Sequence, residues 1–122
     1  MRPFRFSLQI DPSTADLDTV GRAAEEAGFD VLTTSDHVGA SRSPLLALTH
    51  VAARTSSIGL GTMVLNNDMR NPVQLAWDAA TLQHLSGGRF ELGLGAGHTP
   101  HEYAATGITL DPPADRKARL AA

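Results

Sequence analysis

Glycine occupies alternate positions in two segments of the chain, and this spacing restricts the fold more than any other feature of the sequence. Gly59 and Gly61 form one series, and Gly93, Gly95 and Gly97 form the other. Successive side chains of a β-strand point to opposite faces, so each series predicts a strand with one face bare of side chains. The opposite face would carry the apolar residues Ile58, Leu60, Val64, Phe90, Leu92 and Leu94. Glycine in a strand is typical of a close approach, so two interpretations stay open: tight packing against neighbouring side chains, or a flat wall for a planar ligand.

Composition limits the classes of protein to consider. The chain has 122 residues, of which 42% are hydrophobic, and this predicts one small domain with a real core. The net charge is −3 without a basic stripe, so no nucleic-acid partner is expected. Cysteine is absent, which excludes disulfides and thiolate metal sites. No apolar run approaches the roughly 20 residues that span a bilayer, and the N-terminus lacks the apolar core of a signal peptide, so we expect a cytoplasmic protein without a membrane partner.

Hydrophobic spacing predicts strands and helices in alternation. Helix starts are marked by Ser43-Pro44 and Asn71-Pro72, each a capping residue followed by proline. The expected strands are Phe4–Ile10, Phe29–Asp36, Ile58–Leu65 and Phe90–Ala96. The expected helices are Asp16–Ala27, Pro44–Arg54, Pro72–Leu85 and Ala114–Ala122, with a short helical turn at His101–Gly107 and a loop at Gly39–Arg42.

This order is a repeated β-α-β unit, which predicts an α/β fold with a parallel sheet and right-handed crossovers. A doubly wound sheet and half of an eight-stranded barrel both fit. Strands covered by helices on both faces are apolar on both, whereas these strands carry polar or glycine residues on one face, including Ser7 and Gln9. The pattern therefore favours about four parallel strands of a (β/α)8 barrel with helices on the outer face, roughly half of the ~250 residues of a closed barrel.

Polar residues follow the predicted strands at the ends where parallel α/β proteins hold their functional groups. Asp36-His37 follows the second strand, where a histidine can exchange a proton near neutral pH, or where the pair can simply cap and pack. The Asn66-Asn67-Asp68 segment fits either a turn or polar recognition, and Arg70 either a phosphate contact or a salt bridge. His98, His101 and Glu102 follow the fourth strand and suggest a ligand-facing loop rather than a metal site, because no cysteine and no obvious third ligand accompany the two histidines. The glycines after Gly93 also fail the dinucleotide-binding spacing.

Three segments resemble the bacterial luciferase-like monooxygenase superfamily, and in particular its coenzyme F420-dependent oxidoreductase branch. They are Ser35-Asp36-His37, the stretch from Gly61 to Pro72, and the stretch from Leu85 to Gly97. The resemblance covers nearly the whole chain and implies a (β/α)8 barrel of ~300 residues, of which residues 1–122 would form the N-terminal half, without the C-terminal half. It also implies that F420, or alternatively FMN, binds at the C-terminal end of the barrel.

The same resemblance implies roles for individual residues. His37 would be the catalytic residue that handles the proton. A cis peptide would join Met63 and Val64 behind the ring of the cofactor. His98 replaces an acidic residue of some sugar-phosphate-oxidising members, which argues against that substrate class. The implied cofactor-binding residues are Asp36, Met63, Val64, Asn66, Gly95, Ala96, Gly97 and His98.

Three functions remain open. The first is F420-dependent hydride transfer to or from a small organic substrate, the second is an FMN-dependent monooxygenase, and the third is an inactive or structural half barrel. Because a half barrel leaves strand edges unpaired, self-association through those edges is expected as one explanation of the length. A truncated gene product and a fragment of a longer polypeptide are the other two explanations, and both are favoured over self-association.

Overall fold

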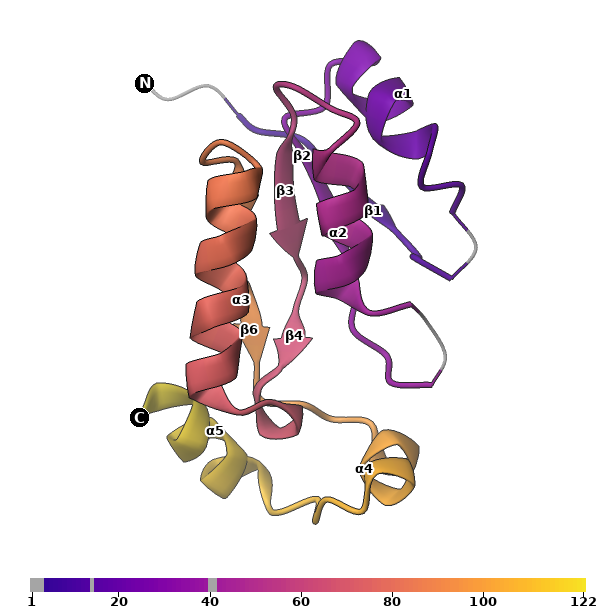
Figure 1. Ribbon diagram of the computed structural model, residues 1–122. Helices are drawn as coiled ribbons and strands as arrows, with labels where there is room; N and C mark the ends of the chain where they lie inside the picture. The colour runs from indigo at the N-terminus through magenta and orange to yellow at the C-terminus, as the bar shows by residue number, and fades with distance from the viewer. Residues whose placement is uncertain (1–3, 14, 40–41) are drawn as a thin grey trace.

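The computed structural model describes residues 4–13, 15–39 and 42–122, so part of the predicted loop Gly39–Arg42 lies outside the described residues. Strands and helices alternate along the chain, as the sequence predicts (Figure 1). The strands are β1 (Ser7–Ile10), β2 (Val31–Thr34), β3 (Gly59–Thr62), β4 (Leu65–Asn66), β5 (Phe90–Glu91) and β6 (Leu94–Gly95). The helices are α1 (Val20–Glu26), α2 (Pro44–Ala52), α3 (Pro72–Leu85), α4 (Pro100–Thr106) and α5 (Pro113–Ala121), with a 3-10 turn, η1, at Asn67–Met69.

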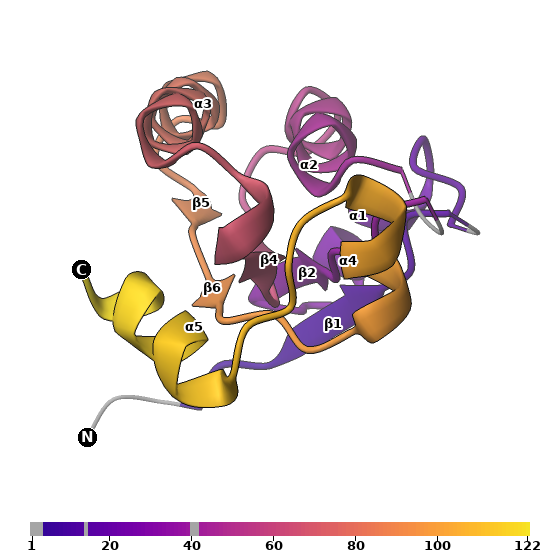
Figure 2. The same ribbon diagram turned by 90° about the horizontal axis from the view of Figure 1, so that it is seen from below.

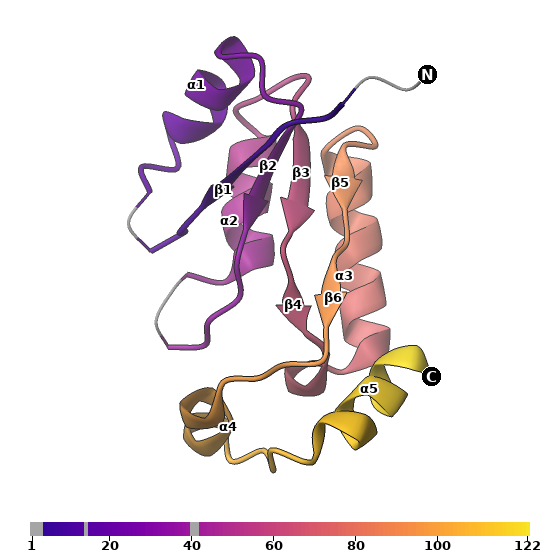
Figure 3. The same ribbon diagram turned by 180° about the vertical axis from the view of Figure 1, so that it is seen from behind.

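The main sheet is parallel and has the strand order β1-β2-β3-β5. A second parallel pair, β4 and β6, lies beyond the ends of β3 and β5 (Figure 3). The helices α1, α2 and α3 cover one face of the sheet, as the view along the strands shows (Figure 2). The opposite face is bare of these helices (Figure 3). This one-sided cover confirms the predicted α/β arrangement with helices on the outer face.

The hydrophobic core lies between the sheet and helices α1 to α3. Leu48 and Val51 of α2 are 1% and 0% exposed, and Leu60 of β3 is 0% exposed. Burial of one such side chain contributes about 1.5–3 kcal/mol. The residues Ile58 and Phe90, which were predicted on this face, also belong to the core cluster.

The proline-marked starts of α2 and α3 are confirmed, but the two caps differ. The side-chain oxygen of Asn71 accepts hydrogen bonds from the backbone N–H groups of Val73 and Gln74. Ser43 stands at the cap position of α2 without a side-chain hydrogen bond. Of these two helices, only α3 therefore has a cap that supplies a partner to the free N–H groups of its first turn.

The two glycine-bearing strands are interrupted, which corrects the prediction of continuous strands at Ile58–Leu65 and Phe90–Ala96. The first is divided at the Met63–Val64 peptide, which is cis as the resemblance implied. Across the break, the hydroxyl of Thr62 donates to the carbonyl of Gly93 and accepts from its N–H, both at 2.9 Å. A Cβ on Gly93 would lie 2.2 Å from the carbonyl oxygen of Thr62, so only glycine fits there.

The interruption also changes which face some side chains occupy. Val64, Leu92 and Leu94 were expected on the core face, but they are 45%, 42% and 37% exposed. Side chains alternate strictly between the two faces of a sheet only along an uninterrupted strand. After the break at Met63–Val64, the side chains no longer follow the alternation set before it. Val64 accordingly faces Gly95, whose Cβ position lies 2.5 Å from a methyl group of Val64.

The ends of the first two elements also differ from expectation. β1 begins at Ser7, and Phe4 and Phe6 are 89% and 67% exposed. α1 begins at Val20 because the carboxylate of Asp16 accepts from the N–H of Asp18 and from a threonine hydroxyl, which makes a local turn.

The carboxylate of Glu25, near the end of α1, holds the loop that leads into β3. It accepts hydrogen bonds from the backbone N–H groups of Ser56, Ser57 and Ile58. These N–H groups lower the pKa of Glu25 to about 2. One side chain thus fixes the start of the central strand.

The face of the sheet opposite the helices is crossed by an ion pair between Arg5 and Glu91. A Cβ on Gly59 would lie 3.5 Å from the Arg5 guanidinium and 3.1 Å from a backbone oxygen. A Cβ on Gly61 would lie 3.3 Å from the Thr33 side chain. At these two glycines the tight-packing interpretation therefore describes the structure. Within the described residues, no helix is long and apolar enough to cross a membrane.

Candidate functional site

A cavity of about 150 Å³ lies at the carboxyl ends of β2, β4 and β6. Eight of the nine predicted site residues line it, and the ninth, Ala96, does not. The lining residues are Ser35, Asp36, His37, Met63, Val64, Asn66, Gly95, Gly97, His98, Thr99 and Glu102. The three strand ends therefore bring together residues that lie far apart in the sequence.

Asp36 is buried at the end of β2 and is held by an arginine. Both of its carboxylate oxygens accept hydrogen bonds from the guanidinium of Arg70, and one also accepts from the backbone N–H of Asn66 at 2.9 Å. Of the two roles that the sequence left open for Arg70, the structure shows the salt bridge. A bidentate pair of this kind fixes the direction of both planar groups, so Asp36 joins β2 to the end of β4.

His37 pairs with the glutamate of the first turn of α4. Its ring Nδ1 lies 2.7 Å from a carboxylate oxygen of Glu102. The Glu102 side chain is 4% exposed, whereas that of His37 is 44% exposed. The imidazole is therefore accessible at the cavity while its partner is enclosed in the protein.

Two apolar side chains stand beside these polar groups. Met63 and Val64 are 50% and 45% exposed and form one wall of the cavity. Gly95 lies against Val64, and any side chain at this glycine would overlap the valine. The wall is apolar and accessible, which is the surface that a planar ring system needs on one side.

Gly97 is enclosed by hydrogen-bonding groups at the other side of the cavity. A Cβ there would lie 2.1 Å from the hydroxyl of Tyr103 and 2.6 Å from the side-chain amide of Asn66. Its φ of +69° is also in the left-handed region. Both the conformation and the space at this position require glycine.

Tyr103 and Asp68 form the centre of a buried hydrogen-bond network below the cavity. The tyrosine hydroxyl lies 3.0 Å from a carboxylate oxygen of Asp68 and 3.4 Å from the side-chain oxygen of Asn66. Burial raises the pKa of Tyr103, and the neighbouring carboxylate adds to this effect. The hydrogen bonds from Arg119 lower the pKa of Asp68.

Two arginines of α5 fasten this network to the rest of the site. Arg116 is buried and donates to the backbone carbonyls of Ala96 and Gly97. Arg119 donates to both oxygens of Asp68, at 3.0 and 2.8 Å. Ala96 therefore contributes to the site region through its carbonyl, although it does not line the cavity.

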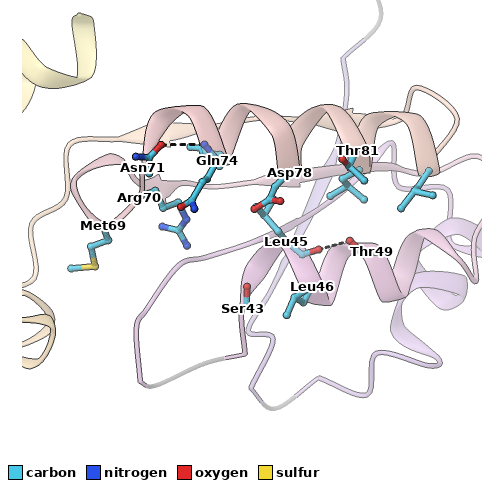
Figure 4. Close-up of a pocket in the computed structure, with 13 residues that line it drawn as sticks. Ser43, Leu45, Leu46, Thr49, Met69, Arg70, Asn71, Gln74, Asp78 and Thr81 are labelled. Atoms are coloured by element: carbon cyan, nitrogen blue, oxygen red, sulfur yellow. Dashed lines mark hydrogen bonds between the residues drawn. The ribbon is translucent and has the colours of Figure 1, made fainter.

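A larger hollow of about 550 Å³ lies between α2 and α3, on the outer side of the molecule (Figure 4). Leu45 and Leu46 of α2 and Gln74 and Asp78 of α3 are among the residues that line it (Figure 4). None of the nine predicted site residues lines this hollow. It meets the strand-end region at Arg70, which lines this hollow and also pairs with Asp36.

Sequence reasoning missed Tyr103, Arg116 and Arg119 as parts of this region, and it placed Glu102 in a ligand-facing loop without pairing it with His37. The spacing of the two arginines places them on one face of a helix, which was the available signal. Their partners lie far away in the sequence and could not be identified from it. Among the described residues, no group of three or more histidines and carboxylates is placed to hold a metal ion.

The model of the luciferase-like monooxygenase family matches residues 3–121. F420-dependent glucose-6-phosphate dehydrogenase of Kineococcus radiotolerans is 42% identical over 105 residues, which are 80% of this chain and 31% of that protein. 4-Hydroxyprotoasukamycin monooxygenase of Streptomyces nodosus subsp. asukaensis is 38% identical over 101 residues, which are 80% of this chain and 26% of that protein.

The structure is similar to that of the coenzyme F420-dependent tetrahydromethanopterin reductase from Methanopyrus kandleri. The TM-score is 0.78 with 30% sequence identity, over 87% of this chain and 30% of that one. The structural neighbours are luciferase-like (β/α)8 barrels, of which this chain corresponds to a part. The chain thus spans about three tenths of the length of the relatives named above.

Proposed function

Because the chain belongs to the luciferase-like monooxygenase family, we propose that it forms part of a barrel oxidoreductase that transfers a hydride between coenzyme F420 and a small organic substrate. The observation that carries the proposal is the cavity at the strand ends, where an apolar wall and a histidine–carboxylate pair meet. The relative from Kineococcus, which is named F420-dependent, supports the choice of cofactor.

The residues of the cavity fit one side of a deazaflavin or flavin site. Ligand sites usually enclose about 300–1,000 Å³, so a cavity of about 150 Å³ corresponds to one wall rather than a whole pocket. Met63 and Val64 would lie against the ring, and Gly95 leaves the wall free of a further side chain. When bound, the cofactor supplies the hydride chemistry, and the protein supplies orientation and surroundings.

His37 would act as the residue that accepts or donates a proton. Its ring is accessible at the cavity and is held at Nδ1 by Glu102. Histidine is the side chain that most often performs this task near neutral pH. A proton would move at the ring nitrogen that does not face the glutamate.

Asp36 and Asn66 would border the cofactor as the structural frame of the site. The oxygens of Asp36 already bind Arg70 and the N–H of Asn66. Their contribution is therefore to hold the ends of β2 and β4 at a fixed distance. Ala96, Gly97 and His98 would border the cofactor from the end of β6.

A second candidate is an FMN-dependent monooxygenase on the same scaffold. It is favoured by the relative from Streptomyces nodosus, which is named a monooxygenase. A third is an inactive or structural part of a barrel. We also propose self-association, because β1 and β5 are the edges of the main sheet in the described part of the chain.

Native mass spectrometry of the purified chain, mixed with equimolar F420 and FMN, tests these proposals. We expect retained F420, and a mass of two or more copies of the chain would support self-association. Retained FMN alone would favour the monooxygenase, and an empty folded monomer would overturn both cofactor binding and self-association by this chain.

The role of His37 is tested by substituting it in a form of the protein that has been shown to bind the cofactor. We expect His37→Ala to lower turnover by about 10²–10⁴-fold, the usual contribution of a proton-transferring group. His84→Ala, on the exposed side of α3, is the matched control and should keep normal turnover. Normal turnover of His37→Ala would contradict the role.

A further inference from the structure

We infer that Glu102 is a positioning residue, which fixes the orientation and tautomer of His37 at the cavity. The inference rests on the proposed function, since it concerns how His37 is prepared to move a proton. It assigns a role to a residue sixty-five positions away from the histidine, on a helix that follows the strands.

The pairing is asymmetric in burial. The carboxylate of Glu102 is enclosed, with 4% of its side chain exposed, and it lies 2.7 Å from Nδ1 of His37. A buried carboxylate is costly unless it is hydrogen-bonded. Among the described residues, Nδ1 of His37 is the side-chain group that hydrogen-bonds to it. The enclosed carboxylate therefore restricts the orientation of the accessible imidazole ring.

Local structure holds Glu102 in this place. Thr99 is the residue before α4, and Pro100 is the first residue of the helix. The backbone N–H of Glu102 donates to the carbonyl of Thr99 at 3.1 Å, which closes the first helical turn. Tyr103, the next residue, is anchored in the buried network with Asp68. The glutamate thus stands on a backbone that is fixed on both sides.

The chemical consequence concerns the two nitrogens of the imidazole ring. A carboxylate accepts but does not donate when ionised, so Nδ1 of His37 must carry the hydrogen between them. In the neutral ring, Nε2 then carries the lone pair. Carboxylate–histidine pairs of this kind set the tautomer and the orientation of the ring. His37 is in this way prepared to accept a proton at Nε2.

The neighbouring histidines do not share this arrangement. His98 lines the cavity but is exposed, and His101 is exposed on α4. His37 is distinguished from them by an enclosed carboxylate. The pair is therefore a specific feature of the strand-end cavity.

The test is the ¹⁵N chemical shift of the ring nitrogens of His37 in the purified chain, which reports the tautomer without any cofactor. The chain has five histidines, and the His37→Ala variant assigns the signal. We expect hydrogen on Nδ1 in the unsubstituted chain. We expect a shift toward the Nε2–H form in Glu102→Ala, and an unchanged signal in the control Glu26→Gln, which alters an exposed carboxylate elsewhere.

Two variants separate positioning from general damage to the fold. Glu102→Gln keeps an acceptor oxygen, so it should retain more of the Nδ1–H form than Glu102→Ala. If Glu102→Ala does not fold, the tautomers of His37 in the unsubstituted chain and in Glu102→Gln still test whether Glu102 sets the tautomer. Hydrogen on Nε2 in the unsubstituted chain, or the same tautomer in a folded Glu102→Ala, would overturn the inference.

Turnover distinguishes this inference from the proposed function. In a cofactor-binding form, we expect Glu102→Ala to lower kcat by about 10–100-fold, as removal of a supporting hydrogen bond usually does. If no cofactor binds while the tautomer depends on Glu102, the proposed function fails and the pairing stands. If a cofactor binds and the tautomer is independent of Glu102, the inference alone fails.

Discussion

The two ends of the sheet are stabilised in different ways. Toward the amino ends of the strands, apolar residues such as Leu48 and Leu60 fill the space between sheet and helices and are almost fully enclosed. Toward the carboxyl ends, the enclosed residues include Asp36, Glu102 and Arg116, which are charged or hydrogen-bonded. Apolar burial therefore contributes most at the amino end, where the hydrogen bonds of Glu25 add to it, and hydrogen bonds between enclosed polar groups contribute more at the carboxyl end.

This difference shows how the fold separates stability from function. Apolar contacts are non-directional, so a core tolerates small shifts of its members. A charged pair that is enclosed tolerates little change, because loss of one partner leaves the other without compensation. The geometry of the cavity is therefore specified more narrowly than the geometry of the core.

The largest effect is expected from a cavity in the apolar end. Leu48→Ala should lower the free energy of unfolding by about 2–5 kcal/mol, since it removes an enclosed side chain. Leu46, two residues earlier on α2, is 73% exposed, and Leu46→Ala is the control, with a change within about 0.5 kcal/mol. Urea unfolding measures both. Equal effects of the two substitutions would show that burial of Leu48 is not what stabilises the apolar end.

A smaller loss of stability, with a local effect on the site, is expected at the polar end. Gly97→Ala places a methyl group in the space of the Tyr103 hydroxyl, with φ at +69°. We expect a loss of about 1–3 kcal/mol and faster amide hydrogen exchange around residues 96–103. Gly107→Ala is the matched control, because its φ is +71° but no atom lies within 4 Å of its Cβ position. Equal losses of stability in Gly97→Ala and Gly107→Ala would show that the close contacts of Gly97 do not matter.

The smallest expected effect is on the pH dependence of stability, and it concerns Glu25, whose carboxylate holds the loop before β3. The pKa of Glu25 is lowered from 4.5 to about 2, so its ionised form stabilises the fold above pH 4.5. That contribution should be lost as the pH falls from about 4.5 to about 2. Glu25→Gln should cost about 1–2 kcal/mol at pH 7 and weaken this acid dependence.

Thermal unfolding of Glu25→Gln between pH 7 and pH 2 provides the measurement. Glu26→Gln alters the next residue, which is exposed, and should keep the acid dependence of the unsubstituted chain. An acid dependence that is the same in both variants would show that Glu25 is not its source.

The sequence predicted the fold where local rules decide. Pro44 and Pro72 set the starts of α2 and α3, and the alternation of strands and helices indicated the parallel sheet. The breaks in the strands were not predictable from alternation. Thr62 replaces the regular ladder by side-chain hydrogen bonds to Gly93, and nothing in a residue pattern distinguishes this from continuous pairing.

The sequence predicted the site residues that follow the strands, but it did not predict the residues that hold them in place. Asp36 and His37 directly follow a strand, and the topology alone brings them to the cavity. Arg116 and Glu102 act through contacts with residues that lie nineteen and sixty-five positions away. Long-range pairings of this kind depend on how the last helices fold back, which the spacing of a single sequence does not record.

The clamp that Arg116 places on the carbonyls of Ala96 and Gly97 has a consequence for the time at which the site forms during synthesis. The strands and their helices emerge from the ribosome first and can bury their apolar residues as they appear. The clamp can close only when a further nineteen residues have been added. The part of the cavity wall at Gly97 can thus be fastened only after the strand that leads to it has been synthesised.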